Sequence, residues 1–247
     1  MMDRIAKMGR TLYGVFGILV IWMLLDFFIV SAVVPAPFET ISYFIRHLDQ
    51  VLIHLLYSFY RIVVAISFSL LIGIPLGMVM GLLRWGDSIL SPIVYLAYPI
   101  PKIAFLPVFM ILFGLGDLSK IILIFSIIVF QIMIGVRDGI KAIPQEVHLS
   151  SQSLGLNSWD KIGHVIFPSI LPKLLSSLRI SIGIAMSALF LGENYATTYG
   201  IGYYIMNNWI MVDYLAMFSG IVGLSLMGLV IFSGIDWIES KWCRWTK

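Results

Sequence analysis

Cysteine is almost absent from this sequence, because Cys243 is the only one in 247 residues. A single cysteine cannot close a disulfide within the chain, and it cannot build a multi-cysteine metal site. The four histidines are scattered and lack the spacing of metal ligands. They are His47, His54, His148 and His164. We therefore expect neither a disulfide framework nor a metal site.

Charged side chains are scarce as well. They make up 12% of the sequence, against about 25% in soluble domains. Hydrophobic residues make up 60%, and the mean hydropathy is +0.99. This balance predicts an integral membrane protein. The net charge of +3 is small, and the basic residues flank apolar runs, which excludes a nucleic-acid-binding surface.

Signatures of catalysis are also missing. The chain has no Gly-x4-Gly-Lys-Ser/Thr phosphate loop, the element with which many ATPases hold phosphate groups. No Ser/His/Asp set and no pair of carboxylates falls on one face. We expect no catalytic residue and no cofactor in this chain. If ATP drives the protein, it must bind another polypeptide.

The abundant feature is the apolar run, and crossing a bilayer takes about 20 such residues. We predict an all-α integral membrane protein with six transmembrane helices in one domain, residues 1–247. The predicted spans are residues 11–34, 51–83, 89–113, 120–136, 174–192 and 214–235. The first run is longer than the apolar core of a signal peptide, which has about 7–15 residues. We therefore expect it to be retained.

The connections carry their own signals. Residues 35–50 have apolar side chains at helical spacing, which predicts a short helix in the membrane interface. Residues 84–87 and 114–117 are predicted turns. Residues 192–213 are rich in Gly, Asn and Tyr and are predicted to be a connection.

Lysine and arginine predict the orientation, because cytoplasmic loops carry an excess of them. With the N-terminus inside, most basic residues fall on the cytoplasmic side, and only Arg46 and Lys120 fall outside. We therefore expect the chain to lie in the inner or plasma membrane. We expect both termini, and the polar loop at residues 137–173, to lie in the cytoplasm.

That polar loop is the organising element of the sequence. Pro144 precedes a helix-like segment that ends at Gly155, and glycine enters the left-handed region without steric cost. A second short segment covers residues 157–167. Two prolines then mark the return into the membrane: Pro168 and Pro172. We predict two short helices, bent at Gly155, that form a docking element.

The loop resembles the cytoplasmic loop of ABC importer permeases, whose signature is E-A-A, three residues, G, nine residues, I-x-L-P. Gly155 stands at the glycine, and residues 165–168 stand at I-x-L-P with conservative changes. The E-A-A triplet itself is replaced. In the family this loop is a coupling helix that docks on an ATPase. The docking residues implied here are Glu146, Leu149, Ser150, Ser151, Gly155, Leu156 and Trp159.

Three further segments resemble the branch of this family that transports nitrate, sulfonates and taurine. They are residues 54–81, 98–120 and 192–205. The resemblance implies a type I importer fold, two ATPase subunits that bind ATP and Mg, a second and identical permease copy, and an extracytoplasmic binding protein. It implies a small anionic substrate, with a pyrimidine-type or other uncharged molecule as the alternative.

Charged residues inside the spans suggest where solute passes. A charge inside a membrane is energetically costly, so its presence favours a functional role. Arg61 and Asp26 fall at similar predicted depth, so Arg61 either pairs with Asp26 or attracts an anionic substrate. Lys102 lies near mid-depth beside prolines that break the third span. The candidates for the translocation path are Arg61, Lys102, Pro99, Pro101 and Glu193.

Two other interpretations stay open at this point. Gly73, Gly77 and Gly81 share one helix face, which favours close packing over a transport role. A secondary transporter or a membrane-embedded enzyme is the alternative class of function. A secondary transporter would favour an internal repeat and mid-membrane carboxylates, and Asp26 is the only carboxylate well inside a predicted span. Neighbouring genes for an ATPase and an exported binding protein would discriminate between these classes.

Overall fold

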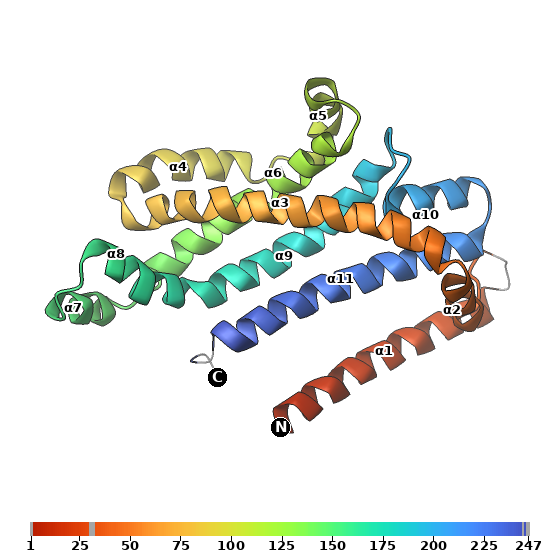
Figure 1. The fold of residues 1–247 in the computed structure, drawn as a ribbon, viewed down its shortest axis with the longest axis horizontal. Coiled ribbons are helices and arrows are strands. Elements are labelled where there is room, and N and C mark those ends of the chain that lie inside the picture. Colours follow the sequence, from red (N-terminus) through yellow and green to blue (C-terminus); the bar gives the residue numbers. More distant parts are fainter. Residues whose placement is uncertain (1, 30–32, 244, 246–247) are drawn as a thin grey trace.

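The computed structural model describes residues 2–29, 33–243 and 245, and the regular secondary structure within that part is entirely helical (Figure 1). The α-helices are α1 (Met2–Phe28), α2 (Pro37–Arg46), α3 (Leu48–Leu82), α4 (Arg84–Ala97), α5 (Leu106–Phe113), α6 (Asp117–Lys141), α7 (Gln145–Ser153), α8 (Ser158–Lys161), α9 (Phe167–Glu193), α10 (Ile201–Ile210) and α11 (Tyr214–Trp242). A 3₁₀ turn covers Lys102–Phe105, and a π turn covers Ile162–Ile166.

Four of these elements are long and apolar enough to cross a membrane: α3, α6, α11 and the continuous rod Ser158–Glu193. The pair α4 and α5 passes the same test together, with a bend of 84° between the two parts. The all-α membrane architecture is therefore confirmed, with up to five spans by this measure. In α1, the apolar helix within the described side chains is Tyr13–Phe28, which is shorter than the other spans.

Helix α6 is the centre of the bundle, with α3 packed on one side and α9 on the other (Figure 1). Ile124, Ile128 and Ile132 recur every four residues along α6, and each is 0% exposed. A spacing of four residues places side chains on one helix face. Burial of such a β-branched stripe against two neighbouring helices fixes α6 in place.

The contact between α3 and α6 depends on glycine. A methyl group at Gly77 would lie 2.7 Å from Cβ of Val136 and 2.8 Å from the Met133 carbonyl oxygen, and Gly73 and Gly81 meet α6 in the same way. The predicted packing role of these glycines is confirmed. Small residues at membrane helix interfaces let backbones approach closely. Because the hydrophobic effect does not drive helices together within lipid, van der Waals contact between α3 and α6 stabilises their packing.

The predicted third span is broken as its prolines indicated, because α4 ends at Ala97 and the chain resumes as the 3₁₀ turn. The turn predicted at residues 84–87 is wrong. Helix α4 begins at Arg84, after the single extended residue Leu83. The chain can turn from α3 into α4 this tightly because Gly86 lies against Val79. A methyl group added at Gly86 would be 2.6 Å from the Val79 carbonyl oxygen.

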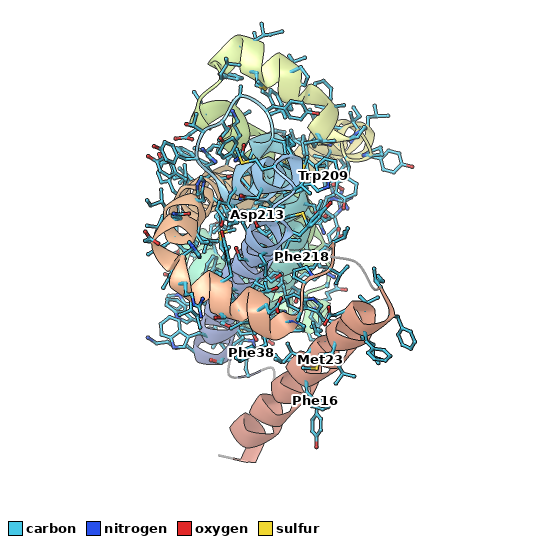
Figure 2. The ribbon with its side chains drawn as sticks, turned by 90° about the vertical axis from the view of Figure 1, so that its right-hand side faces the viewer. Phe16, Met23, Phe38, Trp209, Asp213 and Phe218 are labelled. Atoms are coloured by element: carbon cyan, nitrogen blue, oxygen red, sulfur yellow. The ribbon has the colours of Figure 1, made fainter. Side chains whose placement is uncertain are left out.

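One helix was missed. Residues 192–213 were predicted as a connection, whereas α10 forms within it, next to the start of α11 and the ends of α3 and α9. The short helix expected within residues 35–50 is confirmed as α2. Figure 2 shows α1 at the side of the bundle, with Phe16 and Met23 outside it. Trp22 of α1 stacks on Phe218 of α11 at 5.7 Å between ring centroids.

Ion pairs join helices at the end of the bundle where α7 and α8 lie. Asp87 of α4 accepts from Arg137 and Lys141 of α6. Arg179 of α9 donates to Asp236, at 2.6 Å, and to a second carboxylate one turn later on α11. These pairs are partly exposed, so each contributes about 0–1 kcal/mol to stability and mainly fixes geometry.

The glycine contact predicts the effect of Gly77→Val. The added side chain would collide with α6, and overpacking of this kind costs about 1–3 kcal/mol. We expect a lower melting temperature and folded yield in detergent, measured by size-exclusion chromatography during heating. Gly17→Val is the control, because nothing lies within 4 Å of the added Cβ there. Equal melting temperatures for the two variants would contradict the close approach.

Candidate functional site

The polar loop has the bend that the sequence predicts. Gly155 has φ of +66°, in the left-handed region. Its N–H donates to the Gln152 carbonyl at 2.9 Å, and the Leu156 N–H donates to the Ser151 carbonyl at 3.3 Å. These two hydrogen bonds form a Schellman-type cap, which satisfies the last carbonyls of α7. The chain therefore turns sharply between α7 and α8.

The second short helix is also confirmed, and Asn157 is its cap, with its side chain accepting from the Asp160 N–H at 2.9 Å. The two prolines after it, predicted to mark the return into the membrane, lie within a helix that runs on. The Phe167 N–H donates to the Ile162 carbonyl, one residue further back than in an α-helix. This π turn lies directly before Pro168, which has no N–H to donate, whereas Pro172 lies inside α9. The rod from α8 to the end of α9 is continuous.

Most of the docking candidates lie on an exposed surface with large apolar side chains, but Ser151 is buried, at 3% exposed. Leu149 is 55% exposed and Trp159 is 82% exposed, and Leu154 beside the bend is 77% exposed. Glu146 is exposed in the first turn of α7. The hydroxyls of Ser150 and Ser151 bond to carbonyls of their own helix. Large exposed apolar groups on a polar loop are typical of a protein contact.

A second polar site lies at the opposite end of the bundle and contains Arg61, which is 3% exposed. Its Nη1 donates to Glu193 Oε1 at 2.5 Å, and its Nε and Nη2 donate to Asp117 Oδ1 at 2.9 and 2.6 Å. The three residues come from α3, α9 and α6. We call the group formed by Arg61, Asp117, Glu193 and Ser58 the outer cluster.

Glu193 is 0% exposed, and both of its oxygens are occupied. The Ser58 hydroxyl donates to the carboxylate at 2.7 Å, and the Gly202 N–H donates to Oε2 at 2.8 Å. Ser58 accepts in turn from the Ile201 N–H at 2.8 Å. The N-terminus of a helix favours negative charge, so Glu193 also anchors the start of α10.

The outer cluster explains the Gly-Ile-Gly turn before α10. Gly200 has φ of +143°, and a methyl group there would lie 2.5 Å from Cδ of Glu193 and 2.7 Å from Nη1 of Arg61. A methyl group at Gly202 would lie 2.6 Å from the Phe190 carbonyl oxygen. Only a backbone without side chains approaches the ion pair this closely.

The structure corrects the expected partner of Arg61. The sequence matched Arg61 with Asp26 by depth, but the ion pairs of Arg61 are with Asp117 and Glu193. Depth along a span does not fix its neighbours. Helix α1 packs against α2 at the side of the bundle, so Asp26 does not reach α3.

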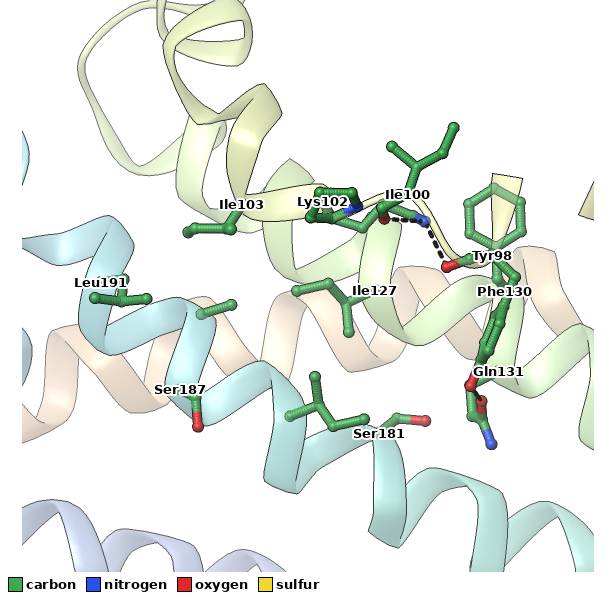
Figure 3. A pocket seen from close by; sticks show the side chains of 13 residues that line it. Tyr98, Ile100, Lys102, Ile103, Ile127, Phe130, Gln131, Ser181, Ser187 and Leu191 are labelled. Atoms are coloured by element: carbon green, nitrogen blue, oxygen red, sulfur yellow. Dashed lines mark hydrogen bonds between the residues drawn. The ribbon is translucent and has the colours of Figure 1, made fainter. Parts of the chain in front are cut away.

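A pocket of about 390 Å³ lies where the third span breaks (Figure 3). Tyr98, Pro101 and Lys102 line it from the break, and α6 and α9 supply the other walls. Most of that lining is apolar, with hydroxyl and amide groups between. The remaining lining residues are Ile100, Ile103, Ile127, Phe130, Gln131, Ser181, Ile184, Ser187, Ala188 and Leu191.

Lys102 is the cation of this pocket. Its Nζ donates to the carbonyls of Ala97 at 2.5 Å, Tyr98 at 3.2 Å and Ile100 at 2.9 Å, and it lies 5.1 Å from the ring centroid of Phe130. These carbonyls lie at the end of α4 and in the connection after it, and a cation is favourable at a helix C-terminus. Among the described lining residues there is no carboxylate, so the positive charge of Lys102 has no counterion in the pocket.

Comparison with known proteins decides the family. Residues 73–243 match the family described as binding-protein-dependent transport system inner membrane component. The chain belongs to this family. This match confirms the family predicted from the polar loop. The members of this family are transport subunits and not enzymes.

Two relatives define the branch. Taurine transport system permease protein TauC of Escherichia coli (strain K12) is 32% identical, over 78% of this chain and 70% of that protein. Putative aliphatic sulfonates transport permease protein SsuC of Bacillus subtilis (strain 168) is 27% identical, over 97% of this chain and 91% of that protein. The predicted branch of the family is confirmed.

A solved structure establishes the fold. The MetNI methionine ABC transporter in an inward-facing conformation contains a chain that superposes on this one with a TM-score of 0.67 at 20% identity. The match covers 76% of this chain and 94% of that chain. This family member therefore has the type I ABC importer permease fold.

The structure divides the predicted path residues between two places. Arg61 and Glu193 meet in the outer cluster, whereas Pro101 and Lys102 line the pocket, and Pro99 is exposed beside it. Sequence reasoning missed Asp117, which it placed in a turn. The available signal was its position at the start of an apolar run, where a helix N-terminus favours a carboxylate.

The outer cluster predicts different outcomes for Arg61→Met and Asp26→Leu. Removing Arg61 leaves Glu193 as an uncompensated buried charge, which typically costs about 3–5 kcal/mol. We expect a large loss of folded yield and of melting temperature in detergent. Asp26→Leu should change both little, within about 0.5 kcal/mol. Adding Glu193→Gln to Arg61→Met should recover part of the yield. An equal loss from Asp26→Leu would restore the partner first inferred from depth.

Proposed function

We propose that this chain is the membrane-spanning subunit of an ATP-driven importer for a small anionic solute, which a separate binding protein delivers. Two identical copies enclose the path, and two ATPase subunits, which carry ATP and Mg, dock on the polar loops. Both termini and the polar loop lie in the cytoplasm. The observation that supports the anionic substrate is the pocket at the broken third span, where Lys102 meets no carboxylate among the described lining residues.

The electrostatics of the pocket favour an anion. A charge in low-dielectric surroundings interacts more strongly than in water, and Lys102 is part-buried beside the apolar ring of Phe130. Its N–H groups are held by backbone carbonyls. The ammonium group therefore acts on a solute through its field, while the hydroxyl of Ser187 and the amide of Gln131 supply hydrogen bonds.

The relatives support the same class of solute, since their names concern taurine and aliphatic sulfonates. An uncharged planar substrate is the alternative. The Tyr98 hydroxyl donates to Gln131 Oε1 at 2.6 Å beside Phe130, and such a group could pair with a pyrimidine. The two substrates differ in their dependence on the charge of Lys102.

The polar loop supports the coupling to ATP. Its exposed Leu149, Leu154 and Trp159 give an ATPase an apolar contact, and Gly155 fixes the angle between α7 and α8. When ATP binding closes the ATPase pair, the two loops move together, and the rods that begin at α8 move with them. In this scheme the path then opens toward the outside.

Substitution of Lys102 tests the substrate class. Lys102→Met removes the charge, and we expect uptake of a radiolabelled alkanesulfonate to fall at least about 10-fold, the equivalent of about 1.4 kcal/mol. Lys102→Arg should retain a substantial part of the uptake. Arg84→Met, in the first turn of α4 and not part of the pocket lining, is the control. Undiminished sulfonate uptake by Lys102→Met in a folded protein would refute the anion site and favour the uncharged substrate.

Substitution of Gly155 tests the docking role. A β-branched residue at a φ of +66° is strained by about 1 kcal/mol or more, although nothing lies within 4 Å of an added Cβ. We expect Gly155→Val to insert and fold normally but to co-purify with much less ATPase, or to leave hydrolysis uncoupled from transport. Gly163→Val, also in open space and without positive φ, should retain the ATPase. Normal transport by Gly155→Val would argue against the bend as a docking determinant.

A further inference from the structure

The two carboxylates that pair with Arg61 differ in how deeply they are buried in the chain. Glu193 is 0% exposed, and Asp117 is 40% exposed. Water competes with an exposed ion pair and makes it weak, whereas a buried pair is costly to break. Arg61 therefore makes one permanent ion pair, with Glu193, and one ion pair that can be released, with Asp117. We call these two ion pairs the Glu193 arm and the Asp117 arm.

The Glu193 arm is locked by more than the ion pair. Ser58 and the Gly202 N–H occupy the same carboxylate, and the close approach of Gly200 leaves no room for a rearranged Arg61 side chain. These contacts bind α3 to the end of α9 and the start of α10. The end of α9 and the start of α10 are therefore held together on the side of α3.

The Asp117 arm is placed at a joint. Asp117 opens α6, directly after a turn with Gly114 at φ of +84° and with Gly116. Nothing lies within 4 Å of an added Cβ at either glycine. The Ser119 hydroxyl donates to the Gly116 carbonyl at 3.0 Å and the Lys120 Nζ donates to the Leu115 carbonyl at 2.5 Å, so the turn and the start of α6 form one unit. A movement of this unit relative to α3 has to break the Asp117 ion pair and the 3.4 Å contact from Lys120 Nζ to the Ala196 carbonyl.

The Asp117 arm lies at the end of α6, a helix that also lines the pocket. Gln131 and Ile127 of α6 form one wall of the pocket, and Ser187 and Leu191 of α9 form the facing wall. Figure 3 shows these two helices with the pocket between their labelled side chains. Leu191 lies two residues before Glu193. The outer cluster thus ties together the outer ends of both walls.

We propose that Arg61 is a positioning residue with two roles: its Glu193 arm keeps α9 and α10 on α3 throughout transport, and its Asp117 arm holds the outer end of α6 against them and releases when the path opens outward. Arg61 contacts no solute in this scheme. The inference rests on the proposed function, because it takes the pocket as part of the path.

The test is the accessibility of the pocket from outside. The single cysteine allows a clean background, Cys243→Ser, in which Ser187→Cys reports from the pocket wall. Cys243 is buried, which raises the pKa of its thiol. The full chain is expressed with its ATPase and binding protein, and intact cells are treated with a membrane-impermeant maleimide. Asp117→Asn is compared with Asp138→Asn, which alters a similarly exposed, arginine-paired carboxylate at the other end of α6.

We expect Asp117→Asn to fold normally and to raise the outside labelling rate at least about 5-fold, the low end of typical coupling between a site and a two-state element. Asp138→Asn should not change it, and Glu193→Gln should lower the folded yield instead. Unchanged outside labelling, with labelling in inside-out vesicles intact, would overturn the release at Asp117 and leave the proposed path standing. No labelling from either side would refute the path itself and the positioning role with it. A folded yield as low for Asp117→Asn as for Glu193→Gln would also overturn the proposal, since neither arm would then be releasable.

Discussion

Satisfaction of backbone polar groups inside hydrocarbon is the constraint on which this structure depends. A bilayer offers no water to unpaired N–H and C=O groups, so a chain that crosses it must be helical or must supply partners wherever a helix stops. Lys102 does this at the broken third span by donating to three carbonyls. Glu193 and Ser58 do it for the first N–H groups of α10. Both functional regions of the membrane interior are thus places where a helix ends and a charged side chain serves the backbone.

The two basic residues at these sites, Arg61 and Lys102, have different surroundings. Arg61 lies among carboxylates, so its charge is compensated and its role is to hold helices together. Lys102 lies among carbonyl dipoles, which orient its ammonium group but leave a net positive charge facing the pocket. Dipoles stabilise a cation without cancelling its charge. An anion would therefore meet a field at Lys102 and little field at Arg61, although both residues are basic and both lie within apolar runs.

Much of the fold could be predicted from the sequence, because bilayer thickness sets span length and the closely spaced Pro99 and Pro101 indicated the break of the third span. Gly155 and the glycine stripe of α3 were also readable, since each meets a local requirement that only glycine fulfils. The partner of Arg61 was not readable, because Asp117 and Glu193 are distant in sequence and depth does not encode which helices are neighbours. Helix α10 was missed for a similar reason. It is anchored by contacts with the outer cluster, and its ten residues are too few to be recognised as a span.

The π turn at residues 162–166 has a mechanical consequence. It joins α8 to α9, so a single rod of 36 residues runs from beside the bend at Gly155 to Glu193. At ~1.5 Å per residue such a rod is ~54 Å long, and a tilt of ~5° about one end would carry the other end through ~5 Å. A small rotation at the polar loop would thus reach the outer cluster as a displacement longer than a hydrogen bond. The chain thus has a lever arm that joins the polar loop to the outer cluster.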